Sequence, residues 1–427
     1  MSRVDGEPVM QRIIAVLLVC HVVGFAFVSA VGDVLAVGPG ASSVAYRGLV
    51  LGLSLLVIIA FFLGQVRFAS SRAWSLCLVF WAALLARLLF DGFWRAIPLP
   101  RGIDEYLLIS IGVCFIPMVA MFSAATASTL RLASSAAFAA CLVTSCLLIW
   151  LLLTGGIVEW SLRLATETLN PISIGYVGAA LVVMAAVHSP QDAAGGVVRL
   201  GLVQIARIGA YPLGMAVVFS SGSRGPLLAM VVAFLLRAIL SAGSRSLGGV
   251  RVALVMLIAA ALLSLGALTL SSIADNSLGP SVAERLGSVR DESTDLRLQA
   301  AAGAVAQFAD SPVFGSSMLE QSTMDYPHNM VLESLIATGI FGAIVFVFFF
   351  LMVARAAVDL IRDARTQWLG MLCVLQLVAT LTSGSLYLTD AFWTLGAATV
   401  AAASTKTVGV VSHYSRRNET SHFVRQY

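Results

Sequence analysis

The chain has 427 residues, of which 59% are hydrophobic and only 11% are charged, and its formal net charge is +4. A soluble domain normally carries about 25% charged residues, so this composition excludes a water-soluble globule. The basic residues are spread between apolar blocks and form no stripe, which argues against a nucleic-acid-binding protein. The composition therefore predicts an integral membrane protein.

The apolar residues fall in continuous blocks of about 17–25 residues, the length of a helix that crosses the roughly 30 Å hydrocarbon core of a bilayer. Backbone groups in lipid must pair within the protein, and barrel strands would alternate in short runs, so these blocks are helices. We expect an all-α integral membrane protein with about twelve transmembrane helices. The expected spans are residues 13–31, 44–64, 74–90, 103–122, 133–153, 172–188, 197–219, 226–241, 250–270, 329–353, 367–384 and 389–405.

These spans divide the chain into four parts. Residues 1–270 form a transmembrane bundle of nine spans, and residues 271–328 form one large loop. Residues 329–405 hold the last three spans, and residues 406–427 form a basic tail. The first apolar stretch is interpreted as an uncleaved span, with a signal peptide cleaved after Ala30 as the alternative.

The distribution of arginine and lysine predicts the orientation. If the N-terminus is cytoplasmic, the inner loops and flanks carry more of these residues than the outer ones, as the positive-inside rule requires. Both termini are then cytoplasmic and the large loop lies outside. In that loop, apolar residues recur at helical spacing in Pro280–Arg290 and from Asp295 to Ala309, so two short amphipathic helices on the outer membrane surface are expected.

Arg224 is a basic residue on the outer side, where the positive-inside rule disfavours one. It lies in the tight link from Ser220 to Pro226, with Pro226 placed as the first residue of the next helix. The unpaired N–H groups and the dipole at such a helix N-terminus favour an anion. The alternative is an arginine that reaches to lipid headgroup phosphates.

His328 lies at a second helix N-terminus on the same side. Pro327 and Asn329 mark the helix start, and an apolar run follows at once. Glu333 lies about one turn further on, on the face of Asn329, and an ionisable group at the membrane boundary is a functional candidate. The alternative is that His328 is a structural cap.

Other polar residues have simpler interpretations. Arg87 and Asp91, four residues apart, are interpreted as a pair that neutralises itself, and Arg207 and Asp390 as structural. The six cysteines lie inside apolar runs and are interpreted as small buried hydrophobic residues. The sequence has no Walker loop, dinucleotide fingerprint, serine elbow or zinc-protease motif.

In this order and spacing, several segments between about residues 220 and 350 resemble the O-antigen ligase / Wzy-type O-antigen polymerase superfamily. The matching residues are Ser223-Arg224-Gly225, the loop arginine Arg297, Asp310-Ser311-Pro312-Val313-Phe314-Gly315, Pro327-His328-Asn329, Leu332-Glu333, Gly339 and Gly342. The family's tryptophan about one turn after the loop arginine is replaced here by Ala301 or Ala302.

The resemblance implies an inverting, metal-independent glycosyltransferase on the outer face of the bacterial plasma membrane, which needs no cofactor. It implies a glycan donor on undecaprenyl diphosphate, and an acceptor that is lipid A-core, a second lipid-linked repeat or another glycan. Arg224 and Arg297 suit the diphosphate, and His328 suits the general base. Substrate-binding roles are expected for Ser223, Arg290, Asn329 and Glu333.

A polytopic transporter or a lipid-linked oligosaccharide flippase is the alternative class. It predicts ionisable residues near the bilayer midplane, or interrupted helices in two matching halves. Gly209 to Pro212 suggest one interrupted span without a counterpart, and the candidate charges lie at the outer boundary instead. The choice between ligase and polymerase stays open.

Overall fold

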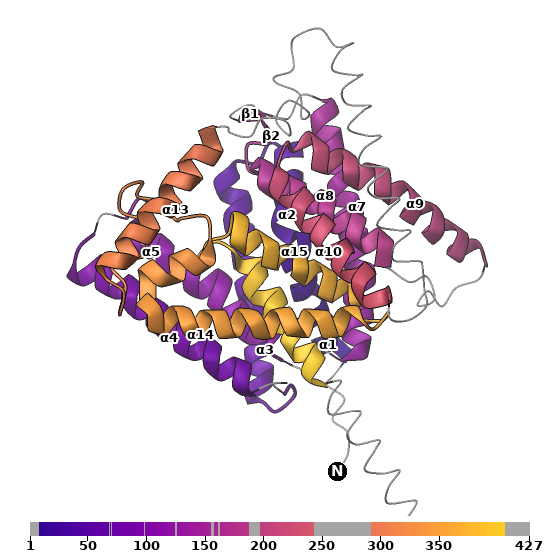
Figure 1. Cartoon of the computed structure of the whole chain (residues 1–427). Helices are drawn as coiled ribbons and strands as arrows, with labels where there is room; N and C mark the ends of the chain where they lie inside the picture. Colours follow the sequence, from indigo (N-terminus) through magenta and orange to yellow (C-terminus); the bar gives the residue numbers. More distant parts are fainter. Residues whose placement is uncertain are drawn as a thin grey trace, which may run out of the picture.

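The computed structural model describes residues 8–67, 69, 71–97, 99–123, 126–154, 158–160, 163–187, 197–242 and 292–405. These residues are mainly helical (Figure 1). The N-terminal elements are α1 (Pro8–Val19), η1 (Cys20–Gly24), α2 (Phe25–Val34), α3 (Pro39–Phe62), α4 (Ser71–Leu89), η2 (Phe90–Trp94), α5 (Gly102–Leu107), η3 (Leu108–Phe115), α6 (Ile116–Met121) and α7 (Ala127–Leu153), where η marks a π-helical segment. They are followed by β1 (Val158–Trp160), β2 (Arg163–Ala165), α8 (Pro171–Val187), α9 (Val197–Ser220), α10 (Arg224–Ala242), α13 (Glu292–Asp310), α14 (Met330–Ile361), α15 (Gln367–Thr382) and a helix at residues 390–405.

Eight helical segments in the described part of the chain are long and apolar enough to cross a membrane. They are Val9–Val34, Pro39–Phe62, Arg72–Trp94, Gly102–Met121, Ala127–Leu153, Gly201–Ser220, Arg224–Ser241 and Met330–Ile361. The helices α8 and α15 are apolar but shorter. Every predicted span overlaps a described helix except the one at residues 250–270, which lies outside the described residues. The helical membrane fold is confirmed, and the count of twelve spans stays a prediction.

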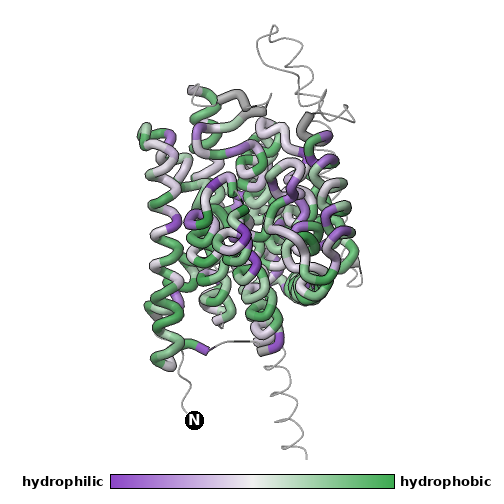
Figure 2. The backbone as a smooth tube through the Cα atoms, turned by 90° about the vertical axis from the view of Figure 1, so that its left-hand side faces the viewer, coloured by the Kyte–Doolittle hydropathy of each residue, from purple (hydrophilic) through white to green (hydrophobic). Residues whose placement is uncertain are grey.

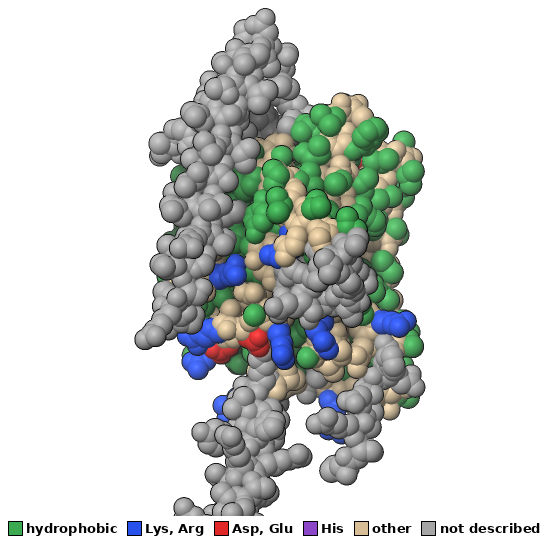
Figure 3. All heavy atoms as spheres, turned by 90° about the vertical axis from the view of Figure 1, so that its right-hand side faces the viewer, with side chains coloured by type: hydrophobic (Ala, Val, Ile, Leu, Met, Phe, Trp, Pro, Cys, Tyr) green, Lys and Arg blue, Asp and Glu red, His purple; other side chains and the backbone are tan. Residues whose placement is uncertain are grey.

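Hydrophobic and charged residues occupy different parts of the protein surface. The tube in Figure 2 is hydrophobic along most of its length, with hydrophilic residues at helix ends and also among the helices in the middle of the molecule. On the face that Figure 3 shows, hydrophobic side chains cover the upper part, and Lys and Arg side chains gather in the lower part. This separation is typical of a protein whose apolar surface faces lipid and whose basic end faces one membrane surface.

Three local features differ from the sequence predictions. The helix α10 begins at Arg224, so Pro226 is its third residue rather than its first. The helix α9 continues through Pro212 without a break, so the predicted interruption is wrong. The small antiparallel hairpin of β1 and β2, with Val158 opposite Ala165, was not predicted because three-residue strands carry too little periodicity.

The helix α15 has a central position, since it packs against α8, α10 and α14 (Figure 1). Beside it, Trp393 from the helix at residues 390–405 stacks on Phe80 of α4 and on Phe349 of α14, with ring centroids 5.8 Å apart in both pairs. The Trp393 indole N–H donates to the Leu386 carbonyl at 2.9 Å. This aromatic cluster therefore holds the loop that follows α15 in place.

The helix α14 is broken near its start by Gly339, which has φ +64° and ψ −167°. The chain from Asp310 to Gly315 packs into this break, where the Ile340 N–H donates to the Pro312 carbonyl at 2.8 Å. A Cβ on Gly339 would lie 2.2 Å from the Val313 carbonyl oxygen. The first nine residues of α14 are thus set apart from the rest of the helix by a contact that requires glycine.

We predict that Gly339→Ala lowers the thermal stability of the purified protein by several degrees, because the methyl group meets backbone and φ is positive. Gly209→Ala is the matched control, since a Cβ there has no neighbour within 4 Å and Gly209 lies within α9. That variant should unfold at the wild-type temperature or slightly above it. Equal unfolding temperatures for all three proteins would contradict the packing described for Gly339.

Candidate active site

Two of the predicted site residues donate hydrogen bonds to the C-terminal end of α15. Arg297 Nη1 donates to the Thr382 carbonyl at 3.2 Å, and Asn329 Nδ2 donates to the Leu381 carbonyl at 3.1 Å. The last carbonyls of a helix lack partners inside the helix, and the helix dipole favours a cation there. Two adjacent carbonyl groups therefore bring α13 and the start of α14 together.

The backbone of Arg224 also lies near the C-terminal end of α15. Arg224 is the first residue of α10, and the next residue, Gly225, faces the end of α15. A Cβ on Gly225 would lie 3.6 Å from Thr382 Oγ1 and 3.9 Å from the Tyr176 hydroxyl. Since Thr382 also binds Arg297, the N-terminus of α10 and the loop arginine meet at one residue.

The position of Arg297 depends on how α13 is held. Gln307 Nε2 donates to the Leu319 carbonyl at 3.1 Å, and the Gln321 N–H donates to Gln307 Oε1 at 2.9 Å. Gly303 packs so closely that a Cβ would lie 2.4 Å from Glu320 Oε1. The predicted helix from Asp295 to Ala309 is confirmed as α13, and it is fixed to the turn that precedes His328. The other predicted loop helix, Pro280–Arg290, lies outside the described residues.

That turn is built around Glu320, whose side chain is buried. Its carboxylate accepts four hydrogen bonds, from the N–H and hydroxyl groups of Ser322 and Thr323. Burial alone would raise the pKa of the Glu320 carboxyl, but these hydrogen bonds outweigh it and lower the pKa. The carboxylate is therefore ionised and keeps the turn rigid.

His328 has an unusual backbone and a half-buried ring. Its φ is +54°, in the left-handed region that non-glycine residues rarely adopt. The imidazole packs edge-on against Tyr326, with 4.4 Å between the ring centroids. Its Nδ1 is buried, and no group of the described residues makes a hydrogen bond to it. The ring is therefore oriented by the strained backbone and by Tyr326.

The charge state of His328 follows from its neighbours. Burial and then the positive charge of Arg297 lower the pKa of His328, while Asp325 acts in the opposite direction and is outweighed. Because the ordinary pKa of histidine is about 6.5, the imidazole is neutral at pH 7. A neutral imidazole can accept a proton.

Asn329 is the N-cap of α14. Its Oδ1 accepts from the N–H groups of Val331 at 3.0 Å and Leu332 at 3.2 Å, while its Nδ2 reaches α15. Both ends of the amide are thus engaged by the protein. Asn329 fixes the start of the helix directly after His328.

Glu333 is fully buried and points into the protein. It accepts from Ser385 Oγ at 3.0 Å and from the Leu386 N–H at 2.7 Å, in the loop between α15 and the following helix. Among the described residues, its hydrogen-bond partners are therefore Ser385 and Leu386, and not His328. This geometry suits a residue that positions the loop.

Two other predicted binding residues have different outcomes. Ser223 is buried directly before Arg224, its N–H donates to Ser221 Oγ at 3.2 Å, and its own Oγ has no partner among the described residues. Arg290 lies outside the described residues. Within the described part of the chain, no group of three or more His, Cys, Asp or Glu side chains is arranged to hold a metal ion.

Arg87 does more than neutralise Asp91, which lies 3.5 Å away. Arg87 Nε donates to the Ala337 carbonyl at 2.8 Å, and Nη2 donates to the Gly315 carbonyl at 3.0 Å. Asp91, fully buried, accepts from the Met318 N–H at 2.9 Å. The pair thus joins α4 and η2 to the residues just before the break at Gly339 and to the segment from Gly315 to Met318, a role that the spacing alone did not indicate.

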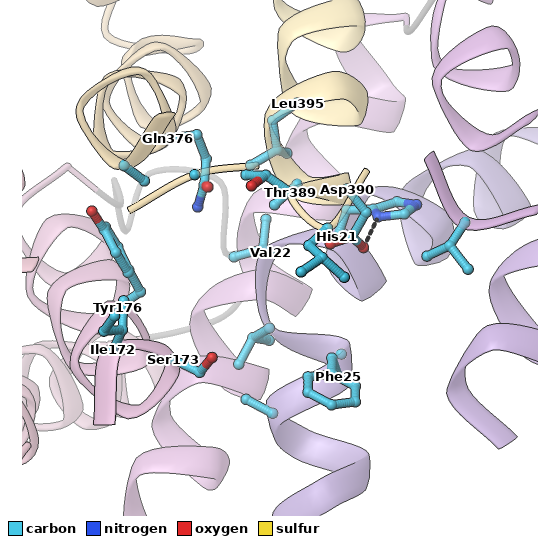
Figure 4. Close-up of a pocket in the computed structure, with 18 of the residues that line it drawn as sticks. His21, Val22, Phe25, Ile172, Ser173, Tyr176, Gln376, Thr389, Asp390 and Leu395 are labelled. Atoms are coloured by element: carbon cyan, nitrogen blue, oxygen red, sulfur yellow. Dashed lines mark hydrogen bonds and ion pairs between the residues drawn. The ribbon is translucent and has the colours of Figure 1, made fainter. Parts of the chain in front are cut away.

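A cavity of about 530 Å³ extends from this region into the helical bundle. Tyr176 and Tyr326 line it near the end of α15, and His21 and Asp390 line it elsewhere (Figure 4). Sequence reasoning did not find His21, because a single histidine inside an apolar run has no local pattern. Its partner is 369 positions away.

The comparison with known families now adds to this geometry. Residues 210–347 match the family model of the O-antigen ligases. The match covers less than half of the chain, and it supports the O-antigen ligase / Wzy-type superfamily. The matched range begins in α9, contains Arg224, Arg297 and His328, and ends in α14 beyond Gly339. The match confirms the resemblance and indicates a membrane enzyme of the O-antigen ligase and polymerase type. No curated protein matches the chain.

We predict that substitutions of Arg297 and Asp325 shift the pKa of His328 in opposite directions. Arg297→Gln removes a positive charge and should raise it, whereas Asp325→Asn removes a negative charge and should lower it. Carbon-13 NMR of histidine-labelled protein in nanodiscs measures both shifts, with His328→Asn to assign the signal among the five histidines. Equal titration curves in all proteins would contradict the electrostatic coupling.

Proposed function

We propose that the chain transfers a glycan from undecaprenyl diphosphate to a hydroxyl group of a glycan acceptor, at the outer face of the bacterial plasma membrane. One observation carries the proposal. The end of α15 brings together the loop arginine, the start of α10 with Arg224, and the His328-Asn329 helix start. The two arginines and the N-terminus of α10 supply positive charge for the diphosphate, and the neutral histidine supplies a base.

The first need is to stabilise the departing diphosphate. The guanidinium groups of Arg224 and Arg297 bind phosphate oxygens through a planar fork, and the N-terminus of α10 adds oriented N–H groups. As the bond between the anomeric carbon and the phosphate oxygen breaks, the electron pair stays on the diphosphate. These charges are in place before the reaction begins, which is the condition for strong electrostatic stabilisation.

The second need is to remove the proton of the acceptor hydroxyl. The lowered pKa of His328 keeps the imidazole neutral, so it can take this proton as the new bond forms to the anomeric carbon. Attack from the side opposite to the diphosphate inverts the anomeric configuration. The donor already has a good leaving group, so the step requires no covalent intermediate and no metal ion.

The partners follow from the same chemistry. The donor is a lipid-linked glycan that reaches the site from the membrane, and the acceptor is a lipid A-core for a ligase or a second lipid-linked repeat for a polymerase. Ser223 and Arg290 are proposed to contact the substrate, whereas the buried Glu333 acts by holding the loop that follows α15. Lipid A-core and lipid-linked repeat, offered separately as acceptors, distinguish the two reactions.

The topology is tested by single cysteines in a cysteine-free background. Gln321→Cys lies in the exposed turn before His328, and Ala364→Cys lies in the exposed turn between α14 and α15. We expect an impermeant maleimide to label Gln321→Cys on intact spheroplasts, and Ala364→Cys only after permeabilisation. The reverse pattern would place the site in the cytoplasm and exclude the proposed donor side.

The catalytic role of His328 is tested by His328→Asn. Asparagine tolerates a positive φ better than most residues. The variant should therefore fold, and its unfolding temperature should equal that of the wild type. It lacks the imidazole, so we expect glycan transfer in nanodiscs to fall by a factor of about 10²–10⁴.

His328→Ala is the matched comparison. It also lacks the imidazole, but alanine is strained at positive φ, so it should lose both stability and transfer. If His328→Asn transfers glycan at the wild-type rate, the base is another residue, and Asp325 becomes the first candidate.

A further inference from the structure

The cavity beside the site has a polar cluster in its wall, inside the helical bundle. Asp390 Oδ2 accepts hydrogen bonds from Tyr46 at 2.9 Å and from His21 Nδ1 at 3.1 Å. The His21 side chain is 0% exposed, while the Asp390 side chain remains 23% exposed. Both donors bind the same oxygen, and no group of the described residues makes a hydrogen bond to the other. The carboxylate is thus fixed from behind and open on its cavity side (Figure 4).

The backbone around this cluster is irregular in two places. The helix α15 has 16 residues and, at about 1.5 Å per residue, is only about 24 Å long. The chain then runs without regular helix to Asp390. His21 lies in the π-helical segment η1, near the middle of the span Val9–Val34. Irregular backbone at membrane depth is tolerated where it lines a polar cavity, and π-helical segments often occur at functional sites.

The opposite wall supplies further hydrogen-bonding groups. Gln376 of α15 and Ser173 of α8 line the cavity across from Asp390, and Tyr176 adds an aromatic ring (Figure 4). A lipid tail in this space would leave these polar groups unsatisfied, which is costly. Two arginines, Arg47 and Arg101, also line the cavity, so its charges alone do not select the ligand, and the choice follows from the hydrogen-bonding groups. A neutral ligand rich in hydroxyl groups satisfies a carboxylate, an amide and a hydroxyl together.

We propose that this cavity, lined by Asp390, His21, Gln376 and Tyr326, binds a saccharide unit through hydrogen bonds from its hydroxyl groups to Asp390. The volume of about 530 Å³ falls in the range of small-molecule sites and accommodates a sugar ring. Tyr326 joins the cavity to the reaction site, because its ring contacts that of His328. The inference rests on the proposed function for the source of the sugar, which is either the donor glycan or the acceptor glycan.

Direct binding tests the site without any need for turnover. Wild-type protein in nanodiscs is mixed with glucose, galactose, rhamnose or N-acetylglucosamine at millimolar concentration, and saturation-transfer NMR reports contact. We expect a signal from at least one sugar, and its loss in Asp390→Asn and in Gln376→Leu. Gln376→Leu is included because no group of the described residues makes a hydrogen bond to the Gln376 side chain, so this variant should fold even if Asp390→Asn misfolds.

Thr144→Val is the control, since Thr144 is buried in α7 and does not line the cavity, and its hydroxyl bonds to the Ala140 carbonyl and to no other group of the described residues. It should bind sugar as the wild type does. An absence of any sugar signal in the folded wild type, or an equal signal in all variants, would overturn the saccharide site. Neither result depends on His328 or on glycan transfer.

Kinetics then identify the source of the sugar. In Asp390→Asn and Gln376→Leu we expect KM to rise about tenfold or more for one substrate only, with kcat changed less, as for the loss of hydrogen bonds made to bound substrate. A higher KM for the lipid-linked donor assigns the cavity to the donor glycan, and a higher KM for the acceptor assigns it to the acceptor. Unchanged KM values for both would overturn the proposal. If the wild type transfers no glycan while sugars bind, the proposed function fails and the saccharide site stands.

Discussion

The candidate site depends on the last carbonyl groups of α15, which have no partners within the helix itself. A helix that ends inside a protein leaves its last carbonyls without partners, and burying them unpaired costs free energy. Here Asn329 and Arg297 donate to Leu381 and Thr382. The two groups that satisfy the helix end are therefore the groups that flank the proposed reaction centre. Their position follows from a backbone requirement, which makes it rigid before any substrate arrives.

Around this helix end, the backbone is strained or irregular at several residues. His328 adopts a positive φ, Gly339 breaks α14, and Arg87 is held at the break by backbone carbonyls. Strained or irregular backbone of this kind persists only where the surroundings over-determine it, and it gathers at functional sites. Glu333 also stabilises this region, because its carboxylate accepts hydrogen bonds from the loop after α15. The result is a histidine whose ring is aimed by backbone and neighbours together.

Local patterns in the sequence predicted the parts of the fold that local physics determines. Apolar blocks located the spans, the spacing of Ala300 and Ala304 located α13, and Asn329 marked the start of α14. The order of motifs also grouped the residues of the site. By contrast, the contact between His21 and Asp390 joins the first described helix region to the last one, and no local pattern encodes it. Glu333 was correctly singled out as an unusual carboxylate, but only the packing reveals its partners.

The contact between buried His21 and partly exposed Asp390 also bears on the alternative of a transporter. Ionisable groups inside the membrane region are what that class predicts. A transporter built from matching halves would also interrupt corresponding helices, but α9 runs unbroken through Pro212 and the break in α14 is filled by the chain before Gly315. The cavity of the pair instead adjoins Tyr326 and the proposed base. A saccharide site explains why a carboxylate is held open toward a cavity that leads to His328, which a separate transport path would leave unexplained.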